Sequence, residues 1–120
     1  MNTAAVPLFN GMSREEVVKK WVTALRSGQY KQTQRVLRNS EGFCCLGVLC
    51  DLNAKMSGQP KWQGAEYLNN DLELPVELQE FILGDRGMAS RLKMNRYAEM
   101  NDDGDKTFIE LADIIERDLL

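Results

Sequence analysis

Three cysteines occupy the short apolar segment FCCLGVLC, residues 43–50. A thiolate can attack a substrate when a nearby cation or a helix N-terminus lowers its pKa. The sequence contains no histidine, so neither a Cys–His pair nor a Ser–His–Asp triad can form. A zinc site made of cysteine alone needs four thiols, and no CxxC pair occurs. We therefore expect Cys44, Cys45 and Cys50 to fill the core, and the alternative is a thiol-dependent enzyme using Cys44 or Cys45.

An acidic segment, residues 99–110, has the spacing of a calcium-binding EF-hand loop. With Gly104 at the position of the obligatory glycine, six oxygen-bearing side chains fall at ligand positions. They are Glu99, Asn101, Asp103, Asp105, Thr107 and Glu110. The glutamate at the first position and Lys106, where loops usually carry an apolar residue, disfavour calcium. We expect a connection between two helices instead, with acidic residues near the positive N-terminus of the second helix, and no metal or other cofactor.

A basic stretch over residues 19–38 is the best candidate for a binding surface. Residues 1–43 hold seven basic and three acidic side chains, a net charge of +4, and the remainder carries −7. Tight binding to duplex nucleic acid is not expected, because it rests on neutralising many phosphates and the whole chain carries −3. A small anionic ligand such as a nucleotide needs only a few arginine forks and a stacking ring. The predicted ligand-binding residues are Tyr30, Gln32, Arg35, Arg38, Trp62 and Asn101.

Helical periodicity and cap residues predict the elements that position these groups. Ser13 and Glu16 have the spacing of a capping box, and so do Thr107 and Glu110. Helices are expected between Ser13 and Gly28, from about Cys45 to Met56, from Pro75 to Gly84, over residues 91–100, and after Thr107. A turn is expected over residues 39–42, with a short strand around Phe43–Cys45 as an option.

The predicted fold class is α+β and predominantly helical, a compact single domain of about five helices with a small β element. We expect a flexible N-terminal segment over residues 1–12, followed by one globular domain over residues 13–120. Residues 57–75 are expected to form a loop that Trp62 and Tyr67 anchor to the core. No leader sequence or membrane span is expected, and a reducing cytoplasm is the expected compartment.

Four segments, in order, resemble a family of small proteins encoded by bacteriophages and prophages that has no established activity. They are KKWVTALRSGQYKQ, LRNSEGFCCLGVLCDL, the Trp62 loop followed by LPVELQEFI, and MNDDGDKTFIELADIIE. FCCLGVLCDL is the most specific of them. Met100 stands where the family usually has leucine, and Thr107 stands where it usually has serine as a helix cap.

The resemblance implies a non-enzymatic phage accessory protein that acts by binding in the bacterial host cell. Such a protein would serve counter-defence or host modulation, by sequestering a nucleotide signal or by blocking a host protein. The alternatives are the thiol-dependent enzyme and a metal-linked or nucleic-acid-linked regulatory module. The oligomeric state stays open, and no membrane partner is expected.

Overall fold

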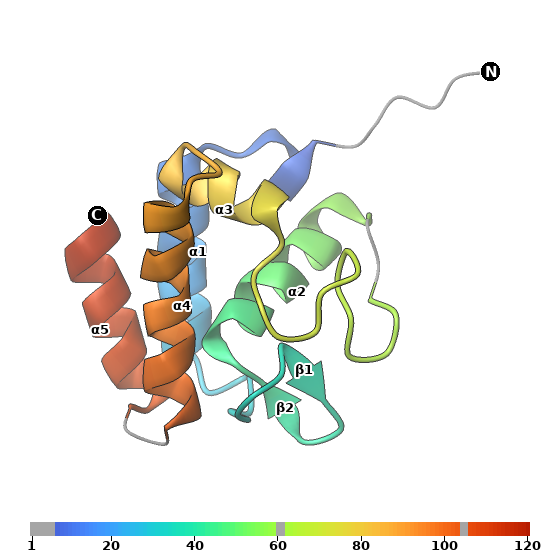
Figure 1. Ribbon diagram of the computed structural model, residues 1–120, viewed down its shortest axis with the longest axis vertical. Helices are drawn as coiled ribbons and strands as arrows, with labels where there is room; N and C mark the ends of the chain where they lie inside the picture. The colour runs from blue at the N-terminus through green and yellow to red at the C-terminus, as the bar shows by residue number, and fades with distance from the viewer. Residues whose placement is uncertain (1–6, 60–61, 104–105) are drawn as a thin grey trace.

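The computed structural model describes residues 7–59, 62–103 and 106–120 (Figure 1). Its elements, in order, are the 3-10 helix η1 (Leu8–Gly11), α1 (Arg14–Arg26), β1 (Arg38–Asn39), β2 (Gly42–Phe43), α2 (Cys45–Ser57), α3 (Val76–Leu83), α4 (Met88–Asp102) and α5 (Phe108–Leu119). The strands pair antiparallel as a small hairpin. The predicted fold class, a predominantly helical α+β domain with about five helices, is confirmed.

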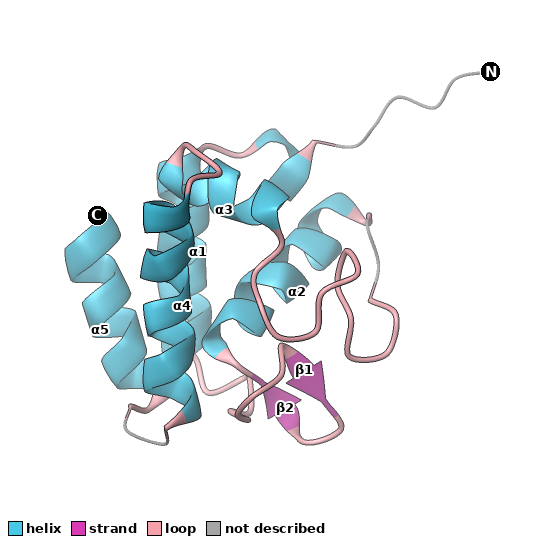
Figure 2. Cartoon of the chain, viewed as in Figure 1, coloured by secondary structure: helices cyan, strands magenta, loops and turns pink. Residues whose placement is uncertain are grey.

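Helices α1 and α5 pack against each other through apolar stripes, and α4 lies beside them (Figure 2). The side chain of Ser13 accepts a hydrogen bond from the backbone N–H of Glu16 and caps α1. The buried stripe of α1 consists of Val17, Val18, Trp21, Val22 and Leu25. The buried stripe of α5 consists of Phe108, Leu111, Ala112, Ile115 and Leu119. Both helices therefore follow the predicted caps and periodicity.

Helix α2 begins directly against the backbone of the hairpin. The Cys44 N–H donates to the Leu37 carbonyl at 3.1 Å. A Cβ atom added at Gly47 would lie 1.8 Å from that same carbonyl oxygen, so only glycine fits there. On the other side of β2, the Phe43 N–H donates to the Lys31 carbonyl at 2.8 Å. The irregular chain before the hairpin thus runs along β2 and is part of the small β element.

The structure corrects three predicted boundaries. Cys44 and Cys45 are the N-cap and the first residue of α2, so β2 ends at Phe43. Helix α4 starts at Met88 rather than residue 91, after Gly87 in extended backbone as its N-cap. The globular domain also begins before residue 13, because Phe9 is buried and its N–H donates to the Asn53 side chain at 2.6 Å. Residues 1–6 of the predicted flexible segment lie outside the described residues.

Candidate functional site

The Asp51 carboxylate, on the middle of α2, joins three segments of the chain. Its side chain is only 10% exposed. It accepts hydrogen bonds from the Tyr30 hydroxyl at 2.6 Å and from the Trp62 indole N–H at 3.0 Å. The Lys55 ammonium, one helical turn away, lies 3.1 Å from it. These donors satisfy a carboxylate that is largely removed from water, and they fix both aromatic rings.

The rings around this centre form an aromatic cluster over the hairpin. Phe43 meets Tyr30 edge-on at 5.0 Å between ring centroids, and it meets Trp62 at 6.0 Å. Trp62 also packs on the buried Tyr67 at 5.0 Å. The predicted anchoring of the long loop by Trp62 and Tyr67 is therefore confirmed.

Arg38 is held on the outer side of this cluster. Its guanidinium carbon lies 4.5 Å from the centroid of the Trp62 ring, a cation–π contact. Its Nε and Nη2 groups donate to the Gly64 carbonyl at 3.2 and 2.6 Å. Among the described residues, no acceptor is paired with its Nη1 group. The charge of Arg38 is thus positioned by internal contacts while part of its hydrogen-bonding capacity stays available.

An open groove of about 740 Å³ lies beside Arg38, and we call it the hairpin groove. Its volume falls in the range of small-molecule sites, about 300–1,000 Å³. Among the described residues that line it, Lys31 and Arg38 contribute two positive charges and Glu41 contributes the one carboxylate. Its other lining residues are Gln29, Asn39, Ser40, Gly42, Phe43, Gly64 and Ala65.

Of the six predicted binding residues, Arg38 lines this groove, Tyr30 and Trp62 belong to the aromatic cluster beside it, and Gln32 and Asn101 lie away from it and serve the fold. Asn101 is fully buried, and its amide donates to the Thr33 carbonyl at 2.8 Å. The Gln32 amide donates to the Asn101 side-chain oxygen at 2.8 Å and to the Lys106 carbonyl at 3.0 Å. Both side chains join the end of α4 to the chain that precedes the hairpin.

Arg35 lies on the same side as Asn101, and its backbone rather than its guanidinium makes the contact. Its N–H donates to the Asp102 carboxylate at 2.8 Å, and its φ is +73°, in the left-handed region. The structure therefore brings together Tyr30, Arg38 and Trp62 and separates them from the other three predicted residues.

Sequence reasoning missed Asp51 and Phe43, and it placed Lys31 in the basic stretch but not among the six predicted ligand-binding residues. The sequence offers one signal for Asp51, a charged residue directly after an apolar run that is expected to be core. The positions of Lys31 and Phe43 depend on the pairing of the hairpin with the chain before it, which the sequence pattern does not show.

All three thiols are buried, so their predicted packing role is confirmed. Cys44 occupies the N-cap of α2, where its sulfur accepts the Gly47 N–H at 3.4 Å. A helix N-terminus favours a thiolate, yet burial dominates and raises the pKa of Cys44 to about 11. Burial also raises the pKa of Cys45 and Cys50 well above the usual 9.0. These groups are thiols at neutral pH and poor nucleophiles; that the protein does no thiol chemistry stays a prediction.

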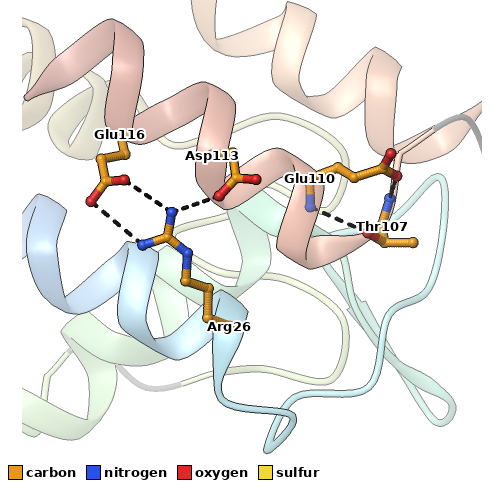
Figure 3. A network of polar contacts seen from close by, with 5 residues as sticks. All are labelled: Arg26, Thr107, Glu110, Asp113 and Glu116. Carbon is orange, nitrogen blue, oxygen red and sulfur yellow. Dashed lines mark hydrogen bonds and ion pairs between the residues drawn. The ribbon is translucent and has the colours of Figure 1, made fainter.

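Three of the six residues at EF-hand ligand positions in the acidic segment serve helix capping or internal contacts. Thr107 and Glu110 form the predicted capping box (Figure 3): Glu110 N–H donates to the Thr107 hydroxyl at 3.2 Å, and the Thr107 N–H donates to the Glu110 carboxylate at 2.9 Å. Asn101 is bonded to Thr33 and Gln32, while Gly104 and Asp105 lie outside the described residues. In the described ranges, no three acidic or cysteine side chains gather as metal ligands.

Arg26, another member of the basic stretch, is occupied by the last helix (Figure 3). Its Nη2 group lies 2.6 Å from Asp113 and 3.0 Å from Glu116. These hydrogen bonds, first with Glu116 and then with Asp113, raise the pKa of Arg26 further above its usual range. Arg26 is therefore part of the α1–α5 interface rather than of a free basic face.

The sequence profile of a family described as a domain of unknown function, DUF8296, matches residues 12–119, and the chain belongs to that family. Comparisons with curated proteins and with solved structures gave no significant match. Within the described ranges, none of the helices is both long and apolar enough to cross a lipid bilayer.

Proposed function

We propose that this protein acts by binding rather than by catalysis, and that it captures a small anionic ligand of the nucleotide class in the hairpin groove. The observation that carries this proposal is the placement of Arg38. Stacking on Trp62 and two hydrogen bonds to the Gly64 carbonyl hold its charge at the groove before any ligand arrives. A group fixed in advance loses little conformational freedom on binding, which favours affinity.

The other groups of the groove suit the same ligand. Lys31 is exposed and supplies a second positive charge, and Gln29 and Ser40 supply neutral donors and acceptors. The edge of the aromatic cluster at Phe43 offers apolar surface to a base or sugar. The buried thiols, with raised pKa values, favour binding over thiol chemistry.

The resemblance to bacteriophage-encoded proteins supports a role in the cytoplasm of a bacterial host. There the protein sequesters a signalling nucleotide and so blunts a defence or regulatory response. A purely electrostatic surface for nucleic acid is less suitable, because Lys31 and Arg38 are the only cations among the described residues that line the groove.

The test is a thermal-shift screen with nucleoside mono- and triphosphates, cyclic mono- and dinucleotides and inorganic phosphate. A ligand that binds only the folded state at a concentration of 100 times its Kd stabilises it by about 2.7 kcal/mol. We expect at least one nucleotide to raise the Tm and phosphate alone to raise it less. A panel in which no nucleotide raises the Tm contradicts the proposal.

A pair of charge reversals localises the site. Lys31→Glu removes a cation whose side chain forms no ion pair with any residue of the described ranges, and it should abolish the ligand-dependent shift in Tm. Lys20→Glu changes the net charge equally on the exposed face of α1 and should leave the shift intact. Equal loss in both variants would assign the effect to overall charge and not to the groove.

A further inference from the structure

A second groove lies between α4 and α5, on the side of the molecule that the hairpin does not reach (Figure 1). We call it the α4–α5 groove; its volume is about 640 Å³ and it is open to solvent. Its apolar lining comes from Leu92 and Met100 of α4 and from Ile114 of α5. Leu92 is 55% exposed, and Met88, one turn before it on α4, is 66% exposed.

The lining residues of α4 form one continuous face of the helix. Ala89, Leu92, Arg96 and Met100 recur at intervals of three or four residues. At 1.5 Å per residue, this face runs for about 16 Å along the helix axis. A groove of this length, with Leu92 and Met100 two turns apart and Arg96 between them, matches the length over which a helix presents anchors at i, i+3, i+4 and i+7.

The rim of the groove is positively charged although the protein is acidic. Lys93, Arg96 and Arg117 contribute three cations against one carboxylate, that of Asp118. Asp118 already accepts from the Tyr97 hydroxyl at 3.0 Å and from the Arg117 Nε at 3.3 Å. Lys93 and Arg96 make no ion pair with any residue in the described ranges.

We propose that the α4–α5 groove docks an acidic amphipathic helix of a partner protein. The apolar face of that helix covers Leu92, Met100 and Ile114, and its carboxylates pair with Lys93 and Arg96. Complementary charge of this kind steers association and rejects basic partners. This surface is separate from the hairpin groove, so it gives the protein a macromolecular partner in addition to a small ligand.

An anionic membrane fits the groove less well than a helix does. Lipid-binding surfaces of this type gather about four to eight basic residues around exposed aromatic side chains. The α4–α5 groove has three cations, and its aromatic residue Tyr97 is 2% exposed and bonded to Asp118. Binding to phosphatidylserine vesicles, compared with binding to peptides, distinguishes a membrane from a helix as the partner.

The experiment is a display selection on the full chain with a library of 16-residue helical peptides. The peptides carry leucine at i, i+3, i+4 and i+7 and random residues elsewhere. We expect the enriched peptides to be rich in glutamate and aspartate and to bind in fluorescence anisotropy. Lys93→Glu/Arg96→Glu should weaken that binding at least tenfold, and peptides with lysine in place of the acids should recover it.

The matched control is Lys19→Glu/Lys20→Glu, which makes the same change in net charge on the exposed face of α1. It should change affinity less than twofold. All these side chains are exposed, so each variant should fold, and circular dichroism is the check. Three results would overturn the proposal: no enriched peptide, peptides that bind the Lys93→Glu/Arg96→Glu variant equally well, or stronger binding of the wild type to phosphatidylserine vesicles than to any peptide.

Discussion

The hairpin–α2 junction and the α1–α5 interface each contain a charged group with several partners, but in different surroundings. The Asp51 side chain is 10% exposed, and its donors come from three segments of the chain. The Arg26 side chain is 37% exposed, and its partners Asp113 and Glu116 are 65% and 50% exposed. Removing Asp51 leaves the part-buried donors of Tyr30 and Trp62 without their acceptor, whereas removing Arg26 leaves groups that water can solvate.

Polar contacts therefore contribute more to stability in the hairpin–α2 junction, and apolar packing contributes more in the α1–α5 interface. In the α1–α5 interface the two buried stripes supply the stability, and the ion cluster lies at its edge. In the hairpin–α2 junction, backbone contact at Gly47 and the carboxylate of Asp51 set the geometry. Substitutions at the junction should have the larger effects.

The largest effect is expected for Gly47→Ala. Its new Cβ would lie 1.8 Å from the Leu37 carbonyl oxygen, which is backbone and has no easy way to move. We expect a loss of about 3 kcal/mol or more in urea unfolding, because overpacking against backbone forces the chain apart. Gly28→Ala is the control: its φ is +77° but nothing lies within 4 Å, so strain alone should cost about 1 kcal/mol. Equal losses in both would show that the junction is not closely packed.

Asp51→Ala should have the next largest effect, about 2–4 kcal/mol in urea unfolding. The Tyr30 hydroxyl and the Trp62 indole N–H would both lose their acceptor in a part-buried site. Trp62 fluorescence should shift to the red as its loop loosens. Asp51→Asn, which keeps one oxygen acceptor, should be intermediate. If Asp51→Ala lowered the free energy of unfolding by less than Thr107→Ala does, substitutions at the junction would not have the larger effects.

Thr107→Ala removes the cap of α5 and should lower stability by about 1 kcal/mol. Its hydroxyl accepts the Glu110 N–H at the start of the helix. Ser13→Ala, at the equivalent position of α1, should give a similar loss, since the same type of contact is removed. Urea unfolding of both variants measures the two caps, and helical circular dichroism at low denaturant should fall only slightly.

Arg26→Ala should have the smallest effect, and that effect should depend on salt and pH. Hydrogen bonding to Arg26 lowers the pKa of Glu116 from its usual 4.5. A carboxyl whose pKa is lower in the folded state stabilises the fold above pH 4.5, and this contribution disappears as the pH falls through the folded value. The difference between variant and wild type should therefore shrink in 1 M NaCl and as the pH falls through the lowered pKa of Glu116. A difference that persists under both conditions would indicate packing by the arginine stem.

Local signals in the sequence were sufficient for much of the fold. The Ser13 cap of α1, the capping box of α5 and the apolar stripes of both helices depend only on residues a few positions apart. The same holds for burial of the cysteines, because a short apolar segment without charged side chains is expected to be buried in the core. The binding surface was less predictable: Asn101 is one of the predicted ligand-binding residues, yet it is fully buried and bonds to Thr33 and Gln32, far away in the chain.

Contacts between distant segments explain the remaining differences. Asp51 gains its role only when Tyr30 and Trp62 arrive from two other segments. Phe9 joins the core through Asn53, 44 residues later. Neither set of contacts produces a periodic pattern in the sequence. The start of the domain at Phe9 and the role of Asp51 could therefore not be predicted from residue spacing alone.

The pairing of α1 with α5 has a consequence during synthesis. Arg14 reaches the Leu119 carbonyl and Arg26 reaches Glu116, so the first long helix is completed by the last. A ribosome adds about 5–20 residues per second, and the roughly 80 residues between these helices take several seconds to emerge. For that time the Trp21 stripe has no permanent cover, and the nascent chain depends on α2 or on a chaperone to shield it.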